Sequence, residues 1–216
     1  MKYAEGIKQI AQLKSYLIEG RYHLIALQGV SQQLKVKLIA MLNPYYPYFI
    51  NGAESKSRIF TDQLIFSRFA FANVRYDQSS YIISSQWSVA DKVINLYTLH
   101  PPSPRNKKLW KVRNNVLHQV KINLNKPSKN TKMLIGDLNI SKHSNRINDI
   151  VQSMHTVNVN SWPNNRYIFP FTALAIDHLW LSKSETICER RRVDNFNWSD
   201  HFAIETNIAF SNKQDN

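Results

Sequence analysis

The sequence has almost no cysteine, no long apolar run and few acidic residues. Its only cysteine among 216 residues is Cys188, which excludes an internal disulfide framework, so the chain needs no oxidising compartment. We expect Cys188 to be a small buried or half-buried apolar residue. No stretch approaches the roughly 18 apolar residues of a membrane span, and the start, MKYAEGIKQIAQLK, lacks the apolar centre of a signal peptide. The sequence therefore predicts a protein without a membrane span, located in the cytoplasm unless a leader precedes the given start.

Basic residues outnumber acidic residues by 28 to 15, which gives a formal net charge of +13. A field of this sign attracts polyanions such as nucleic acids, nucleotides and anionic lipid head groups. The alternative is a basic surface that keeps the protein soluble and has no phosphate ligand. The cluster of Lys107, Lys108, Lys111 and Arg113 fits that alternative, because charge runs are usually solvated. A hydrophobic content of 43% predicts a folded core.

Hydrophobic spacing alternates between helical and strand periods along the chain. Helical spacing predicts helices over residues 3–17, 31–43, 101–124 and 146–154. Strand patterns cover residues 23–30, 58–69, 80–89, 93–100, 132–140, 173–182 and 201–210. The first of them, HLIALQGV, is apolar on both faces, which predicts a central strand. With no repeat or linker, this alternation predicts a single α/β domain over residues 1–216.

Polar residues stand in or beside several of these strands. Asp137 and Asn139 close LIGDLN, and their spacing of two places both side chains on one face. An Asx turn that ends the strand is the alternative interpretation. Asp177 lies within the apolar ALAIDHLWLS, where a carboxylate is costly unless it is paired or bound to a metal. Its neighbour His178 points to the opposite face, and we expect it to be structural.

The last strand and the strand over residues 93–100 are flanked by histidines. Asp200 and His201 stand just before the last strand, and a carboxylate beside an imidazole suits a metal ligand next to a general base. Ordinary turn chemistry is the alternative for this pair. His100 ends VINLYTLH and is followed by prolines; taken alone, it is a surface histidine.

Taken together and in order, the segments LIALQGV, FSRF, TLHPPSP, IGDLN, AIDHLWLS and SDHFAIE resemble the endonuclease/exonuclease/phosphatase superfamily. The resemblance runs from about residue 5 to residue 210, and NSWPNNRYIFPFTALAIDH further resembles a branch of small bacterial members. It implies the DNase I-like fold, a four-layer α/β sandwich of two packed β-sheets flanked by helices. It also implies hydrolysis of a phosphoester by water with a divalent metal, Mg²⁺ or Mn²⁺.

The resemblance also implies a role for each motif residue. His201 would act on the attacking water or stabilise the phosphoryl group, and Asp177 would pair with it and fix its tautomer. Asp137 and Asn139 would orient water and phosphate, and His100 would donate to a phosphate oxygen. These roles agree with the chemistry of phosphoryl transfer, which needs positioning and charge neutralisation more than covalent help.

The metal side of the site departs from the family pattern. Asp200 matches a metal ligand, but Gly29 stands where the family carries a metal-binding glutamate. Family members also open with a strand that ends in a metal-binding asparagine, whereas the given sequence opens with the helix that follows it. Glu54 and Asp62 are candidate substitutes, and Asp62 also falls where some relatives carry a carboxylate that orients the histidine equivalent to His100. We therefore expect Mg²⁺ or Mn²⁺ to be held weakly, if at all.

Two hypotheses follow. In the first, the protein is a metal-dependent phosphoester hydrolase of the phosphodiesterase or nuclease type, impaired by Gly29. In the second, it is a catalytically inactive relative that binds nucleic acid or another phosphate-rich ligand. Both predict a phosphate-bearing partner, with DNA and RNA as candidates.

Overall fold

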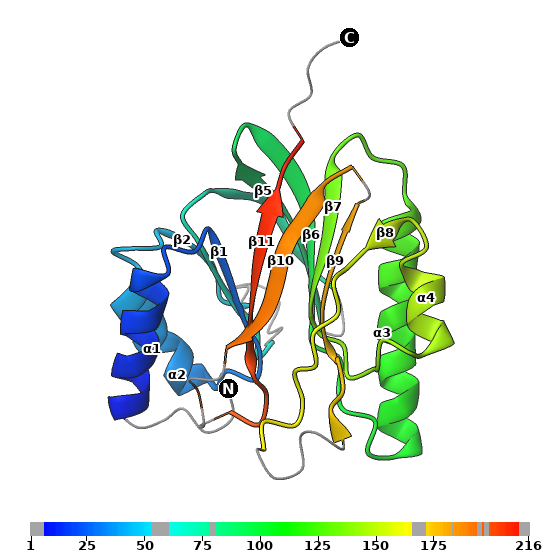
Figure 1. Cartoon of the computed structure of the whole chain (residues 1–216), viewed down its shortest axis with the longest axis horizontal. Coiled ribbons are helices and arrows are strands. Elements are labelled where there is room, and N and C mark those ends of the chain that lie inside the picture. The colour runs from blue at the N-terminus through cyan, green and yellow to red at the C-terminus, as the bar shows by residue number, and fades with distance from the viewer. Residues whose placement is uncertain are drawn as a thin grey trace.

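The computed structural model describes residues 7–52, 61–77, 81–165, 172–182, 184–193, 196 and 199–211. These residues form two layers of strands between two layers of helices (Figure 1). One outer layer contains α1 (Ile7–Glu19) and α2 (Gln32–Leu42). The other contains α3 (Lys107–Asn125) and α4 (Asn145–Ile150).

The strand layer beside α1 and α2 consists of two groups. The three-stranded sheet has the order β1 (Leu24–Leu27), β3 (Leu64–Ser67), β2 (Tyr48–Ile50). The second group is the antiparallel pair of β10 (Thr186–Val193) and β11 (Ala203–Ala209). No pairing between the described residues of β1 and β11 joins the two groups into one sheet.

The strand layer beside α3 and α4 is a single six-stranded sheet. Its order is β4 (Phe71–Tyr76), β5 (Ile82–Val89), β6 (Lys92–Leu99), β7 (Thr131–Asp137), β9 (Asp177–Ser182), β8 (Met154–His155). Strands β6 and β7 run parallel, and the helix α3 connects them. The remaining neighbours in this sheet are antiparallel.

The hydrophobic core follows the same layers. One cluster, which includes Leu17, Leu38 and Phe66, packs α1 and α2 against the first strand layer. Another packs α3 and α4 against the six-stranded sheet, and further clusters fill the space between the two strand layers. Strand β10 contributes Val193 to the cluster on the helix side and Ile187 to a cluster between the strand layers. Since β11 pairs with β10, both strands belong to the first strand layer. The predicted four-layer α/β sandwich is thereby confirmed.

Most predicted elements are present close to their expected limits. The Ser31 hydroxyl accepts a hydrogen bond from the Leu34 N–H at 3.3 Å and begins α2, which ends before Pro44 as predicted. The Asn106 side chain caps α3 in the same way, with a distance of 2.9 Å to the Leu109 nitrogen, so this helix begins after the prolines. The first residues of the predicted N-terminal helix, 3–6, lie outside the described part of the chain.

Strands β2, β4, β8 and β10 were not predicted, and the expectations for Cys188 and for the position of β1 were wrong. Strand β10 was missed, because ICERRRV carries four charges among its residues and lacks a simple apolar alternation. Cys188 lies in this strand and is exposed, because it follows the buried Ile187 and so points to the opposite face. Strand β1 lies at the edge of its sheet, within the described residues, although its sequence predicts a central strand.

Among the described residues, no helix is both long and apolar enough to cross a bilayer.

Candidate active site

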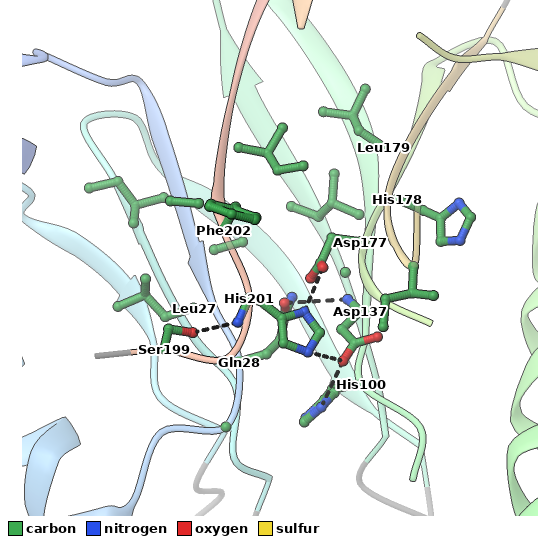
Figure 2. Close-up of a pocket in the computed structure, with 18 of the residues that line it drawn as sticks. Leu27, Gln28, His100, Asp137, Asp177, His178, Leu179, Ser199, His201 and Phe202 are labelled. Carbon is green, nitrogen blue, oxygen red and sulfur yellow. Dashed lines mark hydrogen bonds and ion pairs between the residues drawn. The ribbon is translucent and has the colours of Figure 1, made fainter. Parts of the chain in front are cut away.

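Strand ends bring the predicted site residues together. His100 follows β6 and Asp137 ends β7, and these strands are parallel, so both residues lie at the same edge of the sheet. Strand β9 runs antiparallel to β7 and begins there, with Asp177 directly opposite Asp137 in the register. His201 precedes β11 and reaches the same place from the other strand layer (Figure 2). All four residues line one cavity of about 1630 Å³.

His201 and Asp177 form a hydrogen-bonded pair. The distance between His201 Nδ1 and Asp177 Oδ2 is 2.7 Å, as the sequence interpretation required. Burial raises the pKa of Asp177, but the His201 ring outweighs it and the net shift is downward. Burial lowers the pKa of His201, but Asp177 and Asp137 outweigh it and the net shift is upward. Asp177 therefore holds a proton on Nδ1 and leaves Nε2 directed into the cavity.

His100 forms a second pair of the same kind with Asp62. Both Asp62 carboxylate oxygens lie 2.8 Å from His100 Nδ1, which agrees with the analogy that assigned Asp62 to orient this ring. Burial lowers the pKa of His100, but the Asp137 and Asp62 carboxylates outweigh it and raise the pKa to about 10. Asp62 also lines the cavity.

Asp137 lies between the two imidazoles. Its Oδ2 is 3.7 Å from His100 Nε2 and 3.8 Å from His201 Nε2, and the residue is only 6% exposed. Figure 2 shows both rings directed at this carboxylate. The site is thus two histidine–aspartate pairs whose free ring nitrogens converge on a third carboxylate. Two convergent ring nitrogens can donate hydrogen bonds to the oxygens of one phosphate or one water.

The turn after β7 satisfies both interpretations of LIGDLN. The Asn139 N–H donates to Asp137 Oδ1 at 2.8 Å, which is the Asx turn, and both residues line the cavity. The Asn139 amide also donates to the Pro101 carbonyl at 3.0 Å, which links this turn to the segment after His100. Gly136 allows β7 to lie close to the end of β6, because a Cβ at this position would lie 1.9 Å from the Leu99 carbonyl oxygen.

Other residues that support the site were not predicted. The Gln28 side chain accepts a hydrogen bond from the Asp137 N–H at 3.3 Å, and Arg190 donates to the Asp177 carbonyl at 2.9 Å. Arg113 was expected on a solvated face, but it is 8% exposed and donates to the Asn139 carbonyl at 2.8 Å. Arg113 lies three residues before Val116 and seven before Val120, which places it on the apolar face of α3. This spacing is the sequence signal that could have predicted its burial. The neighbouring Lys107, Lys108 and Lys111 are exposed, as expected.

His178 lines the cavity but has its own hydrogen-bond partners away from the two histidine–aspartate pairs. Its Nε2 lies 2.8 Å from the Ile140 carbonyl oxygen, its Nδ1 accepts from the Trp180 indole at 3.2 Å, and it points away from the other labelled site residues in Figure 2. Burial lowers the pKa of this ring. The expectation of a structural histidine is confirmed.

The metal side of the site is less complete. Ligand atoms of Asp137, Asp177 and His201 lie within 4.8 Å of one another, but the Asp177 oxygen already accepts from His201. Asp200 is exposed at the cavity wall and has the oxygen chemistry that Mg²⁺ prefers. Gly29 lines the same cavity with φ of 66°, a left-handed conformation that favours glycine, and offers no ligand. Glu54, the other candidate, lies outside the described residues.

Both the sequence and the fold of this chain resemble known proteins. A model described as "Endonuclease/Exonuclease/phosphatase family" matches residues 4–201. A search of curated protein sequences finds no match. The structure is similar to D. rerio TDP2 complexed with single strand DNA product, with a TM-score of 0.72 at 16% identity over 93% of this chain and 91% of that chain.

Two further solved structures share the architecture. A family protein from Leptotrichia buccalis has a TM-score of 0.70 at 18% identity over 94% of each chain. A mannosyl-6-phosphatase from Bacteroides thetaiotaomicron has a TM-score of 0.67 at 12% identity over 94% of this chain and 91% of that chain. At these identities the similarity shows a common fold.

Proposed function

The chain belongs to the endonuclease/exonuclease/phosphatase family, and from this premise we propose that it hydrolyses phosphoesters at the cavity between β6, β7, β9 and β11. The observation that carries the proposal is the convergence of His100 and His201 on Asp137, each ring held by its own carboxylate. Phosphoryl transfer depends on positioning and charge neutralisation, and two oriented imidazoles supply both.

Each residue has a distinct role in this proposal. Protonated His100 donates from Nε2 to a phosphate oxygen, because the Asp137 and Asp62 carboxylates raise its pKa and keep the ring charged at neutral pH. His201 uses its Nε2 to orient the attacking water or to stabilise the phosphoryl group, while Asp177 fixes its tautomer. Asp137 and the Asn139 turn position the water and the phosphate between the rings.

The donor set fits a weakly held divalent cation. Asp200 would be its ligand, and Mg²⁺ tolerates few protein ligands because it retains several waters. Gly29, which lines the same cavity, supplies no further charge for the cation. When bound, the cation would neutralise negative charge on the phosphate.

The surface beside the cavity favours nucleic acid as the phosphate-bearing partner. Trp110 on α3 is 45% exposed, and the Arg146 guanidinium lies 5.6 Å from its ring centroid. Lys107, Lys108 and Lys111 on the same helix are exposed, and Leu109 lines the cavity. An exposed aromatic ring in a basic surface can stack on a base while the lysines neutralise phosphates. The TDP2 complex with single-strand DNA supports this assignment by fold.

A turnover screen tests the proposal. DNA, RNA and a bis-phosphodiester are each incubated with the protein and Mg²⁺ or Mn²⁺, and the products are quantified. We expect His201→Ala to abolish turnover, and His118→Ala to leave it unchanged, because His118 is exposed and does not line the cavity. Equal turnover by His201→Ala and the wild type would refute the assignment of the site.

Gly29 favours a second candidate function, a non-catalytic protein that binds nucleic acid. This candidate predicts no metal-dependent product, but binding to oligonucleotides that weakens steeply with salt. Trp110→Ala should then weaken binding to single-stranded DNA by roughly tenfold, as expected from a lost stacking contact. Salt-independent binding would count against both candidates.

A further inference from the structure

The two members of the His201–Asp177 pair come from different strand layers. His201 precedes β11 of the first layer, whereas Asp177 begins β9 of the six-stranded sheet (Figure 2). Within the described part of the chain, no strand pairing joins β9 to β11. Because the distance of 2.7 Å between His201 Nδ1 and Asp177 Oδ2 tolerates little displacement, other contacts must fix the two layers at this point.

A short segment, residues 161–164, is bound to the strand that carries Asp177. We call this segment the clasp; its sequence is SWPN. Ser161 is fully buried, and its N–H donates to the Leu174 carbonyl at 2.9 Å. The backbones of Trp162 and Leu174 exchange hydrogen bonds in both directions. The Asp177 N–H donates to the Ser161 hydroxyl at 3.2 Å, which attaches the clasp to the start of β9.

The other edge of the clasp binds the backbone on both sides of His201. The Phe202 N–H donates to the Ser161 carbonyl at 2.8 Å. The Asn164 N–H donates to the Asp200 carbonyl at 2.7 Å. The clasp therefore connects the backbone around His201 to the strand of its partner carboxylate.

The Asn164 side chain adds two hydrogen bonds that depend on its chemistry. Its amide nitrogen donates to the Phe196 carbonyl at 2.6 Å and to the Ser199 carbonyl at 3.0 Å. An amide NH₂ group has two donors, so one asparagine can bind two backbone carbonyls of the same loop. The backbone contacts of the clasp do not need a particular side chain at position 164, whereas these two contacts do.

From these contacts we infer that Asn164 is a positioning residue, which sets where Asp200 and His201 stand relative to Asp177. Ser161 and Asn164 are not among the described residues that line the cavity, so Asn164 acts through the loop that it holds. Misplacement of a reacting group by about 1 Å can lower a rate by about 100-fold. The expected loss of turnover rests on the proposed function, whereas the expected change in the His201–Asp177 pair does not.

Removing the Asn164 amide should leave the fold intact. Arg190 of β10 donates to the Asp177 carbonyl at 2.9 Å and to the Val157 carbonyl at 2.8 Å. These contacts tie β10 to the strand of Asp177 independently of the clasp. Asn164 is half-buried and neutral, so its replacement by alanine adds no charge to the site.

Proton NMR of the histidine rings tests the positioning directly. A ring N–H held by a carboxylate gives a signal downfield of the backbone amides, and the His100–Asp62 pair provides a second such signal in the same spectrum. Asp177→Asn identifies the His201 signal by removing it. In Asn164→Ala we expect the His201 signal to be lost. The His100 signal should remain, since no described contact of Asn164 reaches that pair.

Turnover of the best substrate of the screen is the second readout. We expect kcat of Asn164→Ala to fall by about 100-fold with little change in KM, because the displaced groups act on the reacting phosphate. Asn130→Ala is the matched control, since the Asn130 amide donates to the Asn95 side chain at 3.3 Å outside the cavity. This control should change neither the His201 signal nor kcat.

An unchanged His201 signal in folded Asn164→Ala would overturn the inference, and so would an unchanged kcat in an active enzyme. A wild type without the His201 signal would overturn it as well, because no held pair would exist. A wild type without turnover would refute the proposed hydrolysis alone, since the NMR comparison still decides whether Asn164 positions the ring. If Asn164→Ala does not fold, Asn164→Ser decides in its place, because a hydroxyl has one donor instead of two.

Discussion

The two sides of the cavity differ in how completely they are built. On one side, two imidazoles are each fixed by a carboxylate. The side chains of Gln28, Arg113 and Arg190 bind the backbone of the neighbouring site residues. On the other side, Gly29 offers no side chain, and β1 is an edge strand among the described residues. In the proposed function the first side positions the phosphate, whereas Gly29 on the second side supplies no side-chain ligand for a cation.

Disrupting the hydrogen-bonded pair of His201 and Asp177 should have the largest effect on turnover. Asp177→Asn removes the carboxylate that holds the Nδ1 proton of His201 and favours the wrong tautomer. We expect kcat for the best substrate of the screen to fall by about 10³-fold, with little change in KM. Stopped assays with Mn²⁺ on the folded variant measure this loss.

Asp149→Asn is the matched control for that variant. Asp149 is exposed and pairs with Lys121 at 2.7 Å, outside the cavity. Its turnover should equal that of the wild type. A similar loss in both variants would mean that charge in general, rather than the Asp177–His201 pair, sets the rate.

The histidine side was predictable from sequence, because its residues come from strand ends with strong local signals. Asp137, Asn139, Asp177 and His201 stand at or beside apolar runs, and parallel and antiparallel pairing then brings the ends together. The family resemblance predicted from these motifs is confirmed by the match to residues 4–201, while the small bacterial branch stays a prediction.

The supporting residues and the strand edges depend on contacts that no local pattern encodes. Arg113 reaches Asn139 across 26 positions of sequence, and its buried state follows from packing of α3 against the sheet. The edge position of β1 depends on which strands pair with it, not on its own composition. Likewise, the exposure of Cys188 follows from its position on the face of β10 opposite the buried Ile187.

Adding a carboxylate at position 29 should have a smaller effect, on the affinity for Mg²⁺. Gly29→Glu supplies a carboxylate at the cavity wall, and we expect it to tighten Mg²⁺ binding by up to about tenfold through added charge. The φ of 66° opposes the change, since a non-glycine residue in this conformation costs about 1–2 kcal/mol. Calorimetric titration with Mg²⁺ measures the affinity, and urea unfolding measures the strain.

Gly29→Ala separates these two effects. Alanine incurs the same backbone strain without a carboxylate, so the difference between the two variants isolates the ligand. If a folded Gly29→Glu binds Mg²⁺ no better than Gly29→Ala does, the position does not face the cation. Tight Mg²⁺ binding by the wild type would equally contradict a lost ligand.

The smallest expected effect concerns pH and sharpens the assignment of His100. Its pKa is raised to about 10 in the folded protein, above the ordinary value of 6.5, so its contribution to stability is fully present below pH 6.5. That contribution is lost as pH rises through 10, because the folded state then gives up the extra proton.

Asp62→Asn removes one of the two carboxylates that raise this pKa, and Asp62 is 46% exposed in its side chain, so the loss is screened. We expect the variant to unfold more easily than the wild type by about 0.5–1 kcal/mol at pH 6, and by less at pH 9. Urea unfolding at the two pH values measures the difference, with Asp149→Asn as control because its partner is a lysine rather than a histidine. A deficit of Asp62→Asn that grows between pH 6 and pH 9 would show that His100 is not held in its charged form by Asp62.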